Sequence, residues 1–383
     1  MVPFDFQPRT RIVFGPDKID TLGELASELG ARRAILVSDR GVIAAGHTGH
    51  GIAALERAGI ETWLFEGVHE NPTTDDVTAG LKLAKRHDPE LIIGLGGGSA
   101  MDCAKGINFL YTNGGTMHNY WGVGKALKPM LPMIAVPTTA GTGSETQSFA
   151  LISDSKTHVK MACGDKKASF RIALLDPKLT VTQPPRVTAL TGIDAIAHAL
   201  ETYVTTLRNP ASLAFSREAW QLLAPNFAAV LERPDDLEAR SGMQLGACFA
   251  GLAIENSMLG ATHALANPLT AEYDIVHGQA VGLMLPHVIR FNGAKVAVMY
   301  HDLLEATGGA NGFPDPQHGV EGLADFVAAL VAKAGLPTKL SACGVPPGKL
   351  RTLAEAAAKQ WTGNFNPRKV GPAELLEIYQ RAL

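Results

Sequence analysis

Over roughly the first 180 residues of the chain, short apolar runs alternate with longer amphipathic segments. Runs rich in Val, Ile and Leu at 33–38, 61–66, 90–95 and 132–136 predict strands, and segments near 49–58, 74–86 and 99–109 have the period of a helix. A parallel sheet with crossover helices requires this alternation, because each crossover has to cover one face of the sheet. We therefore expect the first half of the chain to form an α/β domain.

The pattern changes at a proline-rich boundary. Asp176-Pro177 and the sequence QPPR at 183–186 interrupt it, because consecutive prolines fit neither a helix interior nor a central strand. Beyond them, stretches rich in Ala and Leu follow a helical period at 189–204, 212–231, 237–265 and 320–334, and no convincing strand is present. The length of 383 residues also favours two domains. We expect an α/β domain at 1–184 and an all-helical domain at 185–383.

The composition is typical of a folded protein that acts on small molecules. The hydrophobic fraction is 46% and the formal net charge is -3, which is too weak to attract nucleic acid or anionic lipid. We find neither a signal peptide nor an apolar stretch long enough to span a membrane, so we expect a cytoplasmic protein. The four cysteines form no CxxC pair, which argues against a disulfide framework and a thiolate zinc site.

A glycine-rich segment, LIIGLGGGSAMD at 91–102, runs from a buried strand into a helix that Ser99 is expected to cap. Such a turn binds phosphate, because glycines allow close approach to the backbone and the helix start supplies N–H donors. A second candidate loop, PTTAGTGSE at 137–145, follows the next strand. A tight turn without ligand would also need glycine, and the G-x-G-x-x-G fingerprint is absent. We therefore expect a variant Rossmann-like domain.

Asp39 follows the first of the predicted strands. Its carboxylate could accept a hydrogen bond from the adenosine ribose and would repel a 2′-phosphate, which favours NAD over NADP. A plain surface aspartate is the alternative interpretation.

An aspartate and three histidines of the second half form a candidate metal site. Asp194 and His198 are spaced i, i+4, so a helix would place both on one side. His263 and His277 are expected at a helix end and the turn that follows. These nitrogen and oxygen donors suit Fe²⁺ or Zn²⁺, which would act on an alcohol as a Lewis acid and favour loss of its hydride. Spacing alone does not distinguish these histidines from the others among the twelve.

At these residues the chain resembles the iron-containing, or group III, alcohol dehydrogenase family, including its lactaldehyde reductase and 1,2-propanediol oxidoreductase members. The matching landmarks are RIVFG at 11–15, ENPT at 70–73, GGGSAMDCAK at 96–105, PTTAGTGSE at 137–145, DP at 176–177, GIDAIAHALE at 192–201, HG at 277–278 and GNFNPR at 363–368. The resemblance implies an N-terminal dinucleotide domain, a helical metal domain, an active site in the cleft between them, and a homodimer or larger assembly.

The resemblance also implies roles for particular residues. The metal ligands that it implies are Asp194, His198, His263 and His277. The cofactor contacts that it implies are Gly97, Gly98 and Ser99 at the pyrophosphate, Asp39 at the ribose, Thr138, Thr139 and Thr142 along the cofactor, Lys160 and Leu179 towards the nicotinamide half, and Asn71 and Asp102.

One position departs from the family pattern. Many members carry His-x-x-x-His-x-x-Gly here, and the second histidine is thought to relay the alcohol proton, whereas this chain has Asn267. Because asparagine cannot titrate, we expect the proton to leave through water and a ribose hydroxyl, or through an acid such as Asp274, while Asn267 orients cofactor or substrate. We expect Phe149 and Ile254 to line the substrate pocket, with ordinary core packing as the alternative.

The sequence thus predicts an NAD-dependent alcohol dehydrogenase with Fe²⁺ or Zn²⁺ that acts on a small alcohol or aldehyde. Other interpretations stay open. One is a relative on the same scaffold, such as a glycerol dehydrogenase or dehydroquinate synthase. Another is a metal-free enzyme of the maleylacetate reductase type, against which the four retained ligands argue. A third, suggested by Asn267, is a non-catalytic protein that binds NAD or metal.

Overall fold

The computed structural model describes residues 3–307 and 314–383. These residues form two compact units, each described here by itself. The α/β unit contains residues 7–139 and 143–183, and the described residues of the helical unit are 3–6, 140–142, 184–307 and 314–383. The division at Gln183 lies next to the predicted boundary, but the inclusion of residues 140–142 in the helical unit was not expected.

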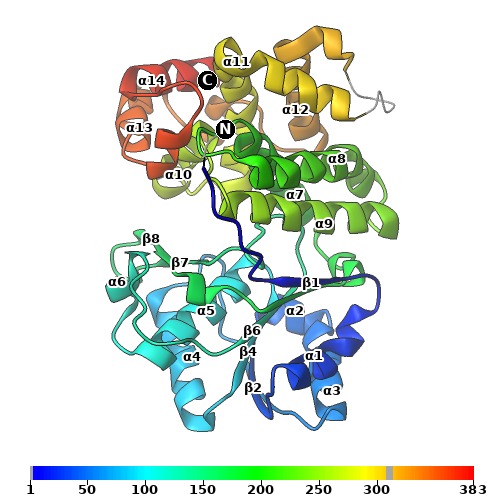
Figure 1. The fold of residues 1–383 in the computed structure, drawn as a ribbon. Helices are drawn as coiled ribbons and strands as arrows, with labels where there is room; N and C mark the ends of the chain where they lie inside the picture. The colour runs from blue at the N-terminus through cyan, green and yellow to red at the C-terminus, as the bar shows by residue number, and fades with distance from the viewer. Residues whose placement is uncertain (1–2, 308–313) are drawn as a thin grey trace. The chain divides into compact units, whose positions relative to one another are not determined.

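A six-stranded parallel sheet in the order β1-β9-β6-β4-β2-β3 forms the centre of the α/β unit (Figure 1). The four predicted strands are present as β2, β3, β4 and β6, and the predicted α/β fold is confirmed. The strands are β1 Arg11–Phe14, β2 Arg33–Val37, β3 Glu61–Phe65, β4 Leu91–Gly96, β6 Met133–Pro137 and β9 Ile172–Leu175.

Helices cover both faces of this sheet. Ile35 and Val37 of β2 pack in a core with α4 and α5, whereas Ala34 and Leu36 pack in a second core with α1 and α3. Because both faces are buried, the central strands are continuously apolar rather than alternating. The helices of the unit are η1 Lys18–Thr21, α1 Leu22–Glu28, α2 Arg40–Ala44, α3 His47–Arg57, α4 Thr74–His87, α5 Gly98–Asn113, α6 Met117–Tyr120, η2 Lys166–Ala168 and η3 Pro177–Thr180.

A second, three-stranded sheet was not predicted. It contains β5 Gly122–Val123, β7 Phe149–Ser153 and β8 Lys160–Gly164 in the order β5-β8-β7, with β7 antiparallel to β8. In β7 the side chains alternate, with Ala150 and Ile152 buried and Leu151 exposed. Five residues of alternation are too few to distinguish from loop sequence by pattern alone.

The helical unit contains eight α-helices among its described residues. The helices are α7 Pro185–Val204, α8 Pro210–Glu232, α9 Leu237–Glu255, α10 Ala261–Tyr273, α11 His277–Ala306, α12 Gly319–Lys333, α13 Leu350–Ala357 and α14 Pro372–Arg381, with η4 Pro316–His318, η5 Leu340–Cys343, η6 Pro347–Lys349 and η7 Trp361–Phe365. The predicted all-helical second half is confirmed.

The predicted single helix at 237–265 is wrong, because α9 ends and α10 begins within it. Gly260 precedes α10, and a Cβ atom there would lie 3.0 Å from Asn366 Oδ1 and 3.1 Å from Glu201 Oε1. Apolar residues continue on both sides of this break, so the hydrophobic period does not reveal it. The break is set by tertiary contacts that only the folded chain makes.

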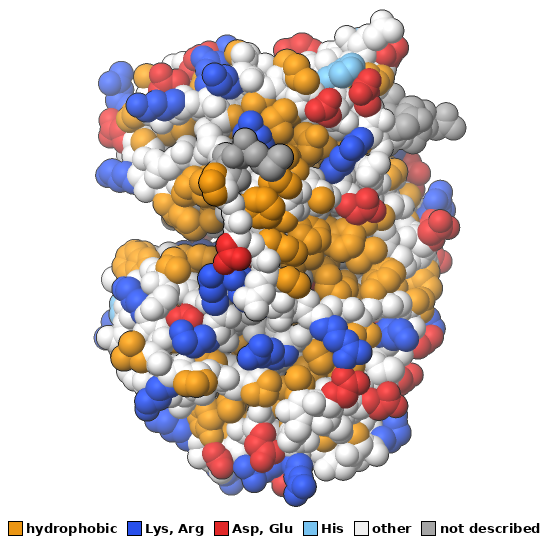
Figure 2. All heavy atoms as spheres, in the orientation of Figure 1, with side chains coloured by type: hydrophobic (Ala, Val, Ile, Leu, Met, Phe, Trp, Pro, Cys, Tyr) orange, Lys and Arg blue, Asp and Glu red, His pale blue; other side chains and the backbone are white. Residues whose placement is uncertain are grey.

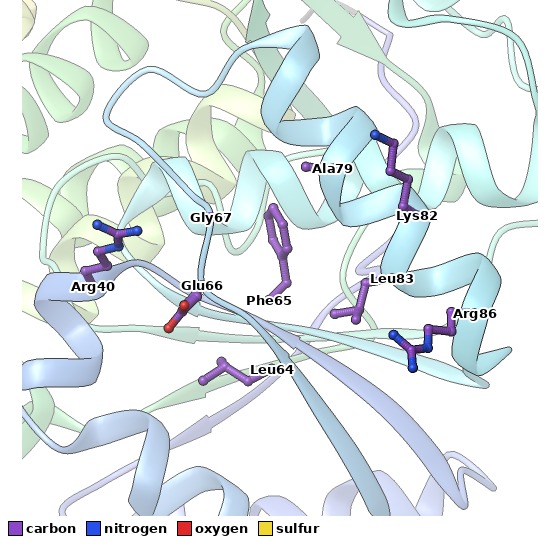
Figure 3. Close-up of a pocket in the computed structure, with 9 residues that line it drawn as sticks. All are labelled: Arg40, Leu64, Phe65, Glu66, Gly67, Ala79, Lys82, Leu83 and Arg86. Atoms are coloured by element: carbon purple, nitrogen blue, oxygen red, sulfur yellow. The ribbon is translucent and has the colours of Figure 1, made fainter.

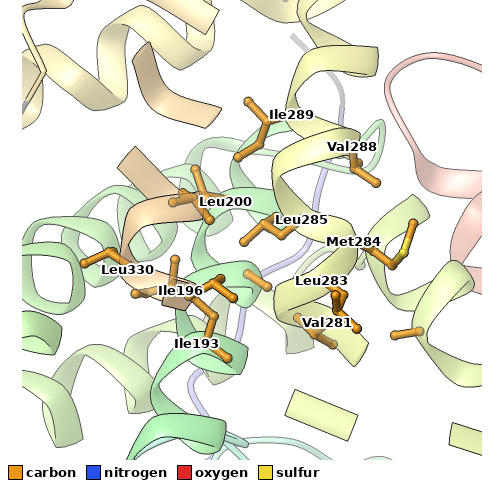
Figure 4. Packing of buried hydrophobic residues seen from close by; sticks show 14 of the residues in the cluster. Ile193, Ile196, Leu200, Val281, Leu283, Met284, Leu285, Val288, Ile289 and Leu330 are labelled. Atoms are coloured by element: carbon orange, nitrogen blue, oxygen red, sulfur yellow. The ribbon is translucent and has the colours of Figure 1, made fainter. Parts of the chain in front are cut away.

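Helix α7 has two distinct faces. Ile193, Ile196 and Leu200 point into the core of the unit, where Leu285 of α11 and Leu330 of α12 also lie (Figure 4). The spacing i, i+3, i+7 places these three residues on one side of the helix. Asp194, His198 and Glu201 of the same helix lie on another side, at spacings of i, i+4 and i+7.

No helix in the described part of the chain is both long enough and apolar enough to cross a membrane. On the face shown in Figure 2, acidic and basic side chains are interspersed. That face thus lacks an extended basic surface of the kind that binds nucleic acid.

Candidate metal centre and cofactor loops

Three helices bring the four predicted metal ligands together. Asp194 and His198 lie one turn apart on α7, His263 is the third residue of α10, and His277 is the first residue of α11. The expectation of His263 at a helix end and His277 in the turn that follows is wrong, because nearly all of α10 lies between them and His277 already belongs to α11. Each histidine in this pair is therefore placed near the start of a different helix.

The carboxylate of Asp194 lies at the centre of this group. Its Oδ1 atom is 3.4 Å from His198 Nε2, 3.3 Å from His263 Nε2 and 3.8 Å from His277 Nε2. The side chains of Asp194, His198 and His263 are buried, and His277 is partly exposed. The donor atoms of Asp194, His263 and His277 thus lie within 4.8 Å of one another, and His198 adds a fourth donor close to Asp194.

The geometry of these donors fits a divalent cation. Asp194 Oδ1 and His263 Nε2 are buried and, although close, have no hydrogen-bond partner. Buried polar atoms are nearly always paired, so two orphaned atoms that face each other need an explanation. Two donors that each lie about 2.1 Å from a shared tetrahedral ion are about 3.4 Å apart. The distance between Asp194 Oδ1 and His263 Nε2 is 3.3 Å. Nitrogen and carboxylate donors suit Fe²⁺ or Zn²⁺.

The charges in the site support this conclusion. Burial alone would raise the pKa of Asp194, but the nearby His198, His263 and His277 outweigh it and hold this pKa well below its usual range. Burial lowers the pKa of His198. Burial would also lower the pKa of His263, but the carboxylates of Glu201 and Asp194 outweigh it and raise this pKa to about 10. Because a metal ligand must be unprotonated, cation binding would displace this proton.

Two further groups contact the ligands, and the sequence did not identify either of them. Glu201 Oε2 accepts a hydrogen bond of 2.5 Å from His263 Nδ1, and the carbonyl oxygen of Gly141 accepts one of 3.2 Å from His198 Nδ1. A signal for Glu201 exists, because it lies seven residues after Asp194 and therefore on the same side of α7. No sequence signal points to the carbonyl of Gly141.

The predicted phosphate-binding loops follow adjacent strands of the large sheet. β2, β4 and β6 are parallel neighbours, and Asp39, Gly97 and Thr138 follow their carboxyl ends. These three residues therefore lie along the same edge of the sheet, the edge formed by the carboxyl ends of its strands. Gly96 has a φ of +152°, and a Cβ atom there would lie 2.8 Å from Ala100 Cβ, so this turn requires glycine. Cofactors of dehydrogenases bind at this edge of such a sheet.

The start of α5 has no side-chain cap. The expectation that Ser99 caps this helix is wrong, because α5 begins one residue earlier, at Gly98, and Gly97 occupies the capping position. Ser99 instead lies in the first turn. The first backbone N–H groups of α5 therefore have no side-chain acceptor at the cap, which is the arrangement that a pyrophosphate requires.

Asp39 and Asp102 hold local structure through their carboxylates. Asp39 caps α2, with Oδ1 accepting a hydrogen bond of 3.0 Å from the amide of Val42. Asp102 is buried, and its carboxylate accepts hydrogen bonds from Ser144 Oγ at 2.6 Å and from the amide of Leu151 at 3.3 Å. Asp102 thus ties α5 to the second loop, a positioning role that the sequence did not predict.

The other predicted cofactor contacts are distributed over both units. Lys160 Nζ donates to Asn71 Oδ1 at 3.1 Å, so these two residues meet. Thr139 packs against Gly97, where a Cβ atom would lie 3.3 Å from Thr139 Cγ2. Leu179 is buried in the core formed with α1 and α3, whereas Thr142 belongs to the helical unit.

Asn267 lies on α10, four residues after His263, and its Nδ2 atom donates to Gln360 Oε1 at 2.9 Å. The Asn267 carboxamide is therefore held in place. Asp274 ends the same helix in a left-handed conformation. The predicted pocket residues lie in different units, with Phe149 in β7 and Ile254 buried in α9.

A cavity of about 450 Å³ lies between α4 and β3, the outermost strand of the large sheet (Figure 3). The residues that line it are Arg40, Leu64, Phe65, Glu66, Gly67, Ala79, Lys82, Leu83 and Arg86. None of the predicted cofactor contacts is among them, so the cavity adds nothing to the case for the dinucleotide site.

The second loop contains a buried acid that makes stability depend on pH. Burial raises the pKa of Glu145 from an ordinary value of 4.5 to about 7. The contribution of Glu145 to the free energy of unfolding is therefore complete below pH 4.5 and is lost as the pH rises to about 7. The total loss is roughly 3 kcal/mol. We expect Glu145→Gln to remove this decline, which urea unfolding at pH 5 and pH 8 would measure. The exposed Glu61→Gln is the control, and an unchanged pH dependence in Glu145→Gln would contradict the prediction.

The α/β unit has the parallel sheet of a dinucleotide-binding domain. The helical unit brings nitrogen and oxygen donors together. This combination is the one expected of a metal-dependent dehydrogenase. Comparison with known families agrees. Residues 8–177 match the model of the iron-containing alcohol dehydrogenases, and residues 188–383 match the C-terminal domain of the Fe-containing alcohol dehydrogenase family. The chain belongs to the iron-containing alcohol dehydrogenase family, as the sequence motifs predicted.

Individual relatives extend over the whole chain. The 1,3-propanediol dehydrogenase of Citrobacter freundii is 34% identical over 381 residues, which cover 99% of this chain and 98% of that protein. A crystal structure of 1,3-propanediol oxidoreductase superimposes with a TM-score of 0.95 at 33% identity, with all of both chains covered. Sulfoacetaldehyde reductase from Bifidobacterium kashiwanohense, solved with NAD⁺, gives a TM-score of 0.91 at 26% identity, with 100% of this chain and 99% of that chain covered. The prediction of an alcohol dehydrogenase is confirmed.

Proposed function

We propose that the chain transfers a hydride between NAD(H) and the carbinol carbon of a small primary alcohol or diol, with a divalent metal held by Asp194, His198, His263 and His277. The observation that carries this proposal is the convergence of three imidazole nitrogens on one buried carboxylate oxygen, at 3.3 to 3.8 Å. A bound divalent ion supplies a Lewis acid that lowers the pKa of an alcohol.

The cofactor half of the proposal rests on the sheet edge. The uncapped start of α5 would receive the pyrophosphate, and Asp39, which uses one oxygen to cap α2, would accept a hydrogen bond from the ribose. The remaining proposed contacts are Asn71, Gly97, Gly98, Ser99, Asp102, Thr138, Thr139, Thr142, Lys160 and Leu179. A relative solved with NAD⁺ supports NAD, and the carboxylate of Asp39 disfavours the 2′-phosphate of NADP.

Asn267 has an orienting role in this proposal. Its carboxamide cannot accept the alcohol proton, which leaves through water and a ribose hydroxyl or through Asp274. The hydrogen bond to Gln360 fixes the carboxamide one helical turn from His263, where it can orient a cofactor or a substrate. We also propose Phe149 and Ile254 as pocket residues.

Location and assembly complete the proposal. A cytoplasmic protein agrees with the lack of any disulfide among the four cysteines, all of which lie in described residues. A homodimer or larger assembly is proposed from the family resemblance.

Metal analysis and turnover test the function together. Protein purified without oxygen is expected to contain about one iron or zinc per chain, and to form NADH from 1,3-propanediol, 1,2-propanediol, ethanol or butanol. We expect chelation to abolish this activity and added metal to restore it, because the proposed ion lowers the alcohol pKa. Mass spectrometry and NADH absorbance measure both quantities.

Two results would contradict the proposal in different ways. Turnover without metal that chelators do not affect would favour a metal-free reductase. Bound metal without turnover on any alcohol would favour a non-catalytic protein, and Asn267 would then be the first residue to examine.

A further inference from the structure

The carboxylate of Glu201 is buried beside the metal site and accepts a hydrogen bond at each oxygen. The side chain belongs to α7, and only 4% of the residue is exposed. Oε2 accepts from His263 Nδ1 at 2.5 Å, and Oε1 accepts from the amide of Thr262 at 2.6 Å. One side chain therefore holds both the ring of a predicted ligand and the backbone next to it.

The first of these bonds selects one form of the His263 ring. A carboxylate can only accept, so Nδ1 must carry the hydrogen. In the neutral imidazole the lone pair is then on Nε2, which is the atom that lies 3.3 Å from Asp194 Oδ1. When the ring is neutral, as a metal ligand must be, its unprotonated nitrogen thus faces the other donors.

The second bond fixes the helix end that carries His263. Gly260 has no side chain to cap α10. The amides of Ala261 and Thr262 are instead capped from elsewhere in the helical unit, by Asn366 Oδ1 at 3.2 Å and by Glu201 Oε1 at 2.6 Å. Because His263 is the next residue, the position of its backbone depends on these two contacts.

We infer that Glu201 is a positioning residue of the metal centre, which sets the ring form of His263 with one oxygen and the position of the start of α10 with the other. This inference rests on the proposed function, because it assumes that the four ligands hold a divalent ion. Carboxylates that hydrogen-bond to a ligating histidine commonly contribute 10- to 100-fold to metal affinity, which sets the size of the expected effect at about this range.

Replacement by glutamine tests both bonds, because the side chain keeps its shape but has only one acceptor oxygen. If that oxygen faces the amide of Thr262, the NH₂ group faces His263 Nδ1, and the ring must carry its hydrogen on Nε2. If the oxygen faces Nδ1, the amide of Thr262 loses its acceptor. Either arrangement disturbs the metal centre.

The experiment measures Co²⁺ affinity by competition with a chromophoric chelator, and the visible d–d spectrum of the bound Co²⁺. We expect Glu201→Gln to weaken Co²⁺ binding by about 10- to 100-fold and to change the spectrum. Asp236→Asn is the matched control, because Asp236 caps the neighbouring α9 through the amide of Ala239 at 3.1 Å. It loses the same charge and one of two acceptor oxygens, the second of which accepts from Arg233, but it contacts none of the four ligands.

The outcomes separate this inference from the proposed function. Unchanged affinity and spectrum in Glu201→Gln, or losses equal to those of Asp236→Asn, would overturn the positioning role and leave the metal site in place. Failure of the wild-type protein to bind Co²⁺ would overturn the proposed metal site and the inference with it. A loss confined to Glu201→Gln supports the inference.

Discussion

Replacement of Asp194 by alanine is expected to abolish metal binding and to lower kcat/KM for alcohol oxidation by at least about a thousandfold. Asp194 Oδ1 is the atom on which the three imidazoles converge, and it supplies the only negative charge among the four proposed ligands. A Lewis-acid metal contributes several kcal/mol to catalysis, and each 1.4 kcal/mol corresponds to about a factor of ten. Metal content and NADH formation, measured on the same preparation, give both effects.

The control for this variant is Asp235→Ala, which makes the same substitution at an exposed position before α9. We expect Asp235→Ala to retain metal and turnover. A far-UV circular dichroism spectrum like that of the wild type would show that Asp194→Ala remains folded. Retention of metal or of turnover by Asp194→Ala would contradict the proposed site.

Lys105→Met is expected to lower the free energy of unfolding by about 3 to 5 kcal/mol, the usual cost of breaking a buried ion pair from one side. Lys105 is fully buried, and its Nζ atom donates to Ser144 O at 2.8 Å, Ser144 Oγ at 2.9 Å and Phe149 O at 2.7 Å. It also lies 3.7 Å from Asp102 Oδ1. Burial already raises the pKa of Asp102 and Lys105 opposes this, so the variant would leave an uncompensated buried acid.

Urea unfolding measures this loss, and Lys82→Met, at an exposed position of α4, is the matched control. Because Lys105 anchors the second loop to α5, we also expect Lys105→Met to weaken NAD binding, which fluorescence titration would measure. If Lys105→Met changes the free energy of unfolding by less than about 1 kcal/mol, the effect is no larger than that of an ordinary surface substitution, and the prediction is wrong.

The sequence predicted several of the longer or more apolar elements, but not α11, the longest helix in the described part of the chain. Four strands of the large sheet, β2, β3, β4 and β6, and helices such as α4 and α7 have predicted positions that agree with the structure, whereas β9 was not predicted. The break between α9 and α10 was missed because apolar residues continue on both sides of it, and the close approach of Glu201 and Asn366 to Gly260 is seen only in the folded chain. The strands β7 and β8 are as long as β2, β3 and β6, but they were missed because their burial changes from residue to residue, and five residues are too few to show that alternation.

The site was predicted unevenly for a similar reason. The spacing of Asp194 and His198 follows from helix geometry, but the choice of His263 and His277 depended on family resemblance, since they lie far away in sequence. Glu201 has the same helical spacing and was overlooked, because a buried glutamate is chemically ambiguous until its partner is known. The capping role assigned to Ser99 was wrong by two positions, because Gly97 is the residue that precedes α5.

The three residues 140–142 have a consequence for how this protein could be divided or recombined. They lie inside the second cofactor loop in sequence, yet they pack with the helical unit, where Gly141 supplies a carbonyl to His198 and a Cβ atom on Gly141 would lie 2.5 Å from Thr191 Cβ. A gene fusion made at the proline boundary would transfer all four proposed metal ligands to a new host. It would leave behind the carbonyl that accepts from His198 Nδ1, so one continuous segment does not carry every group that contacts the proposed ligands.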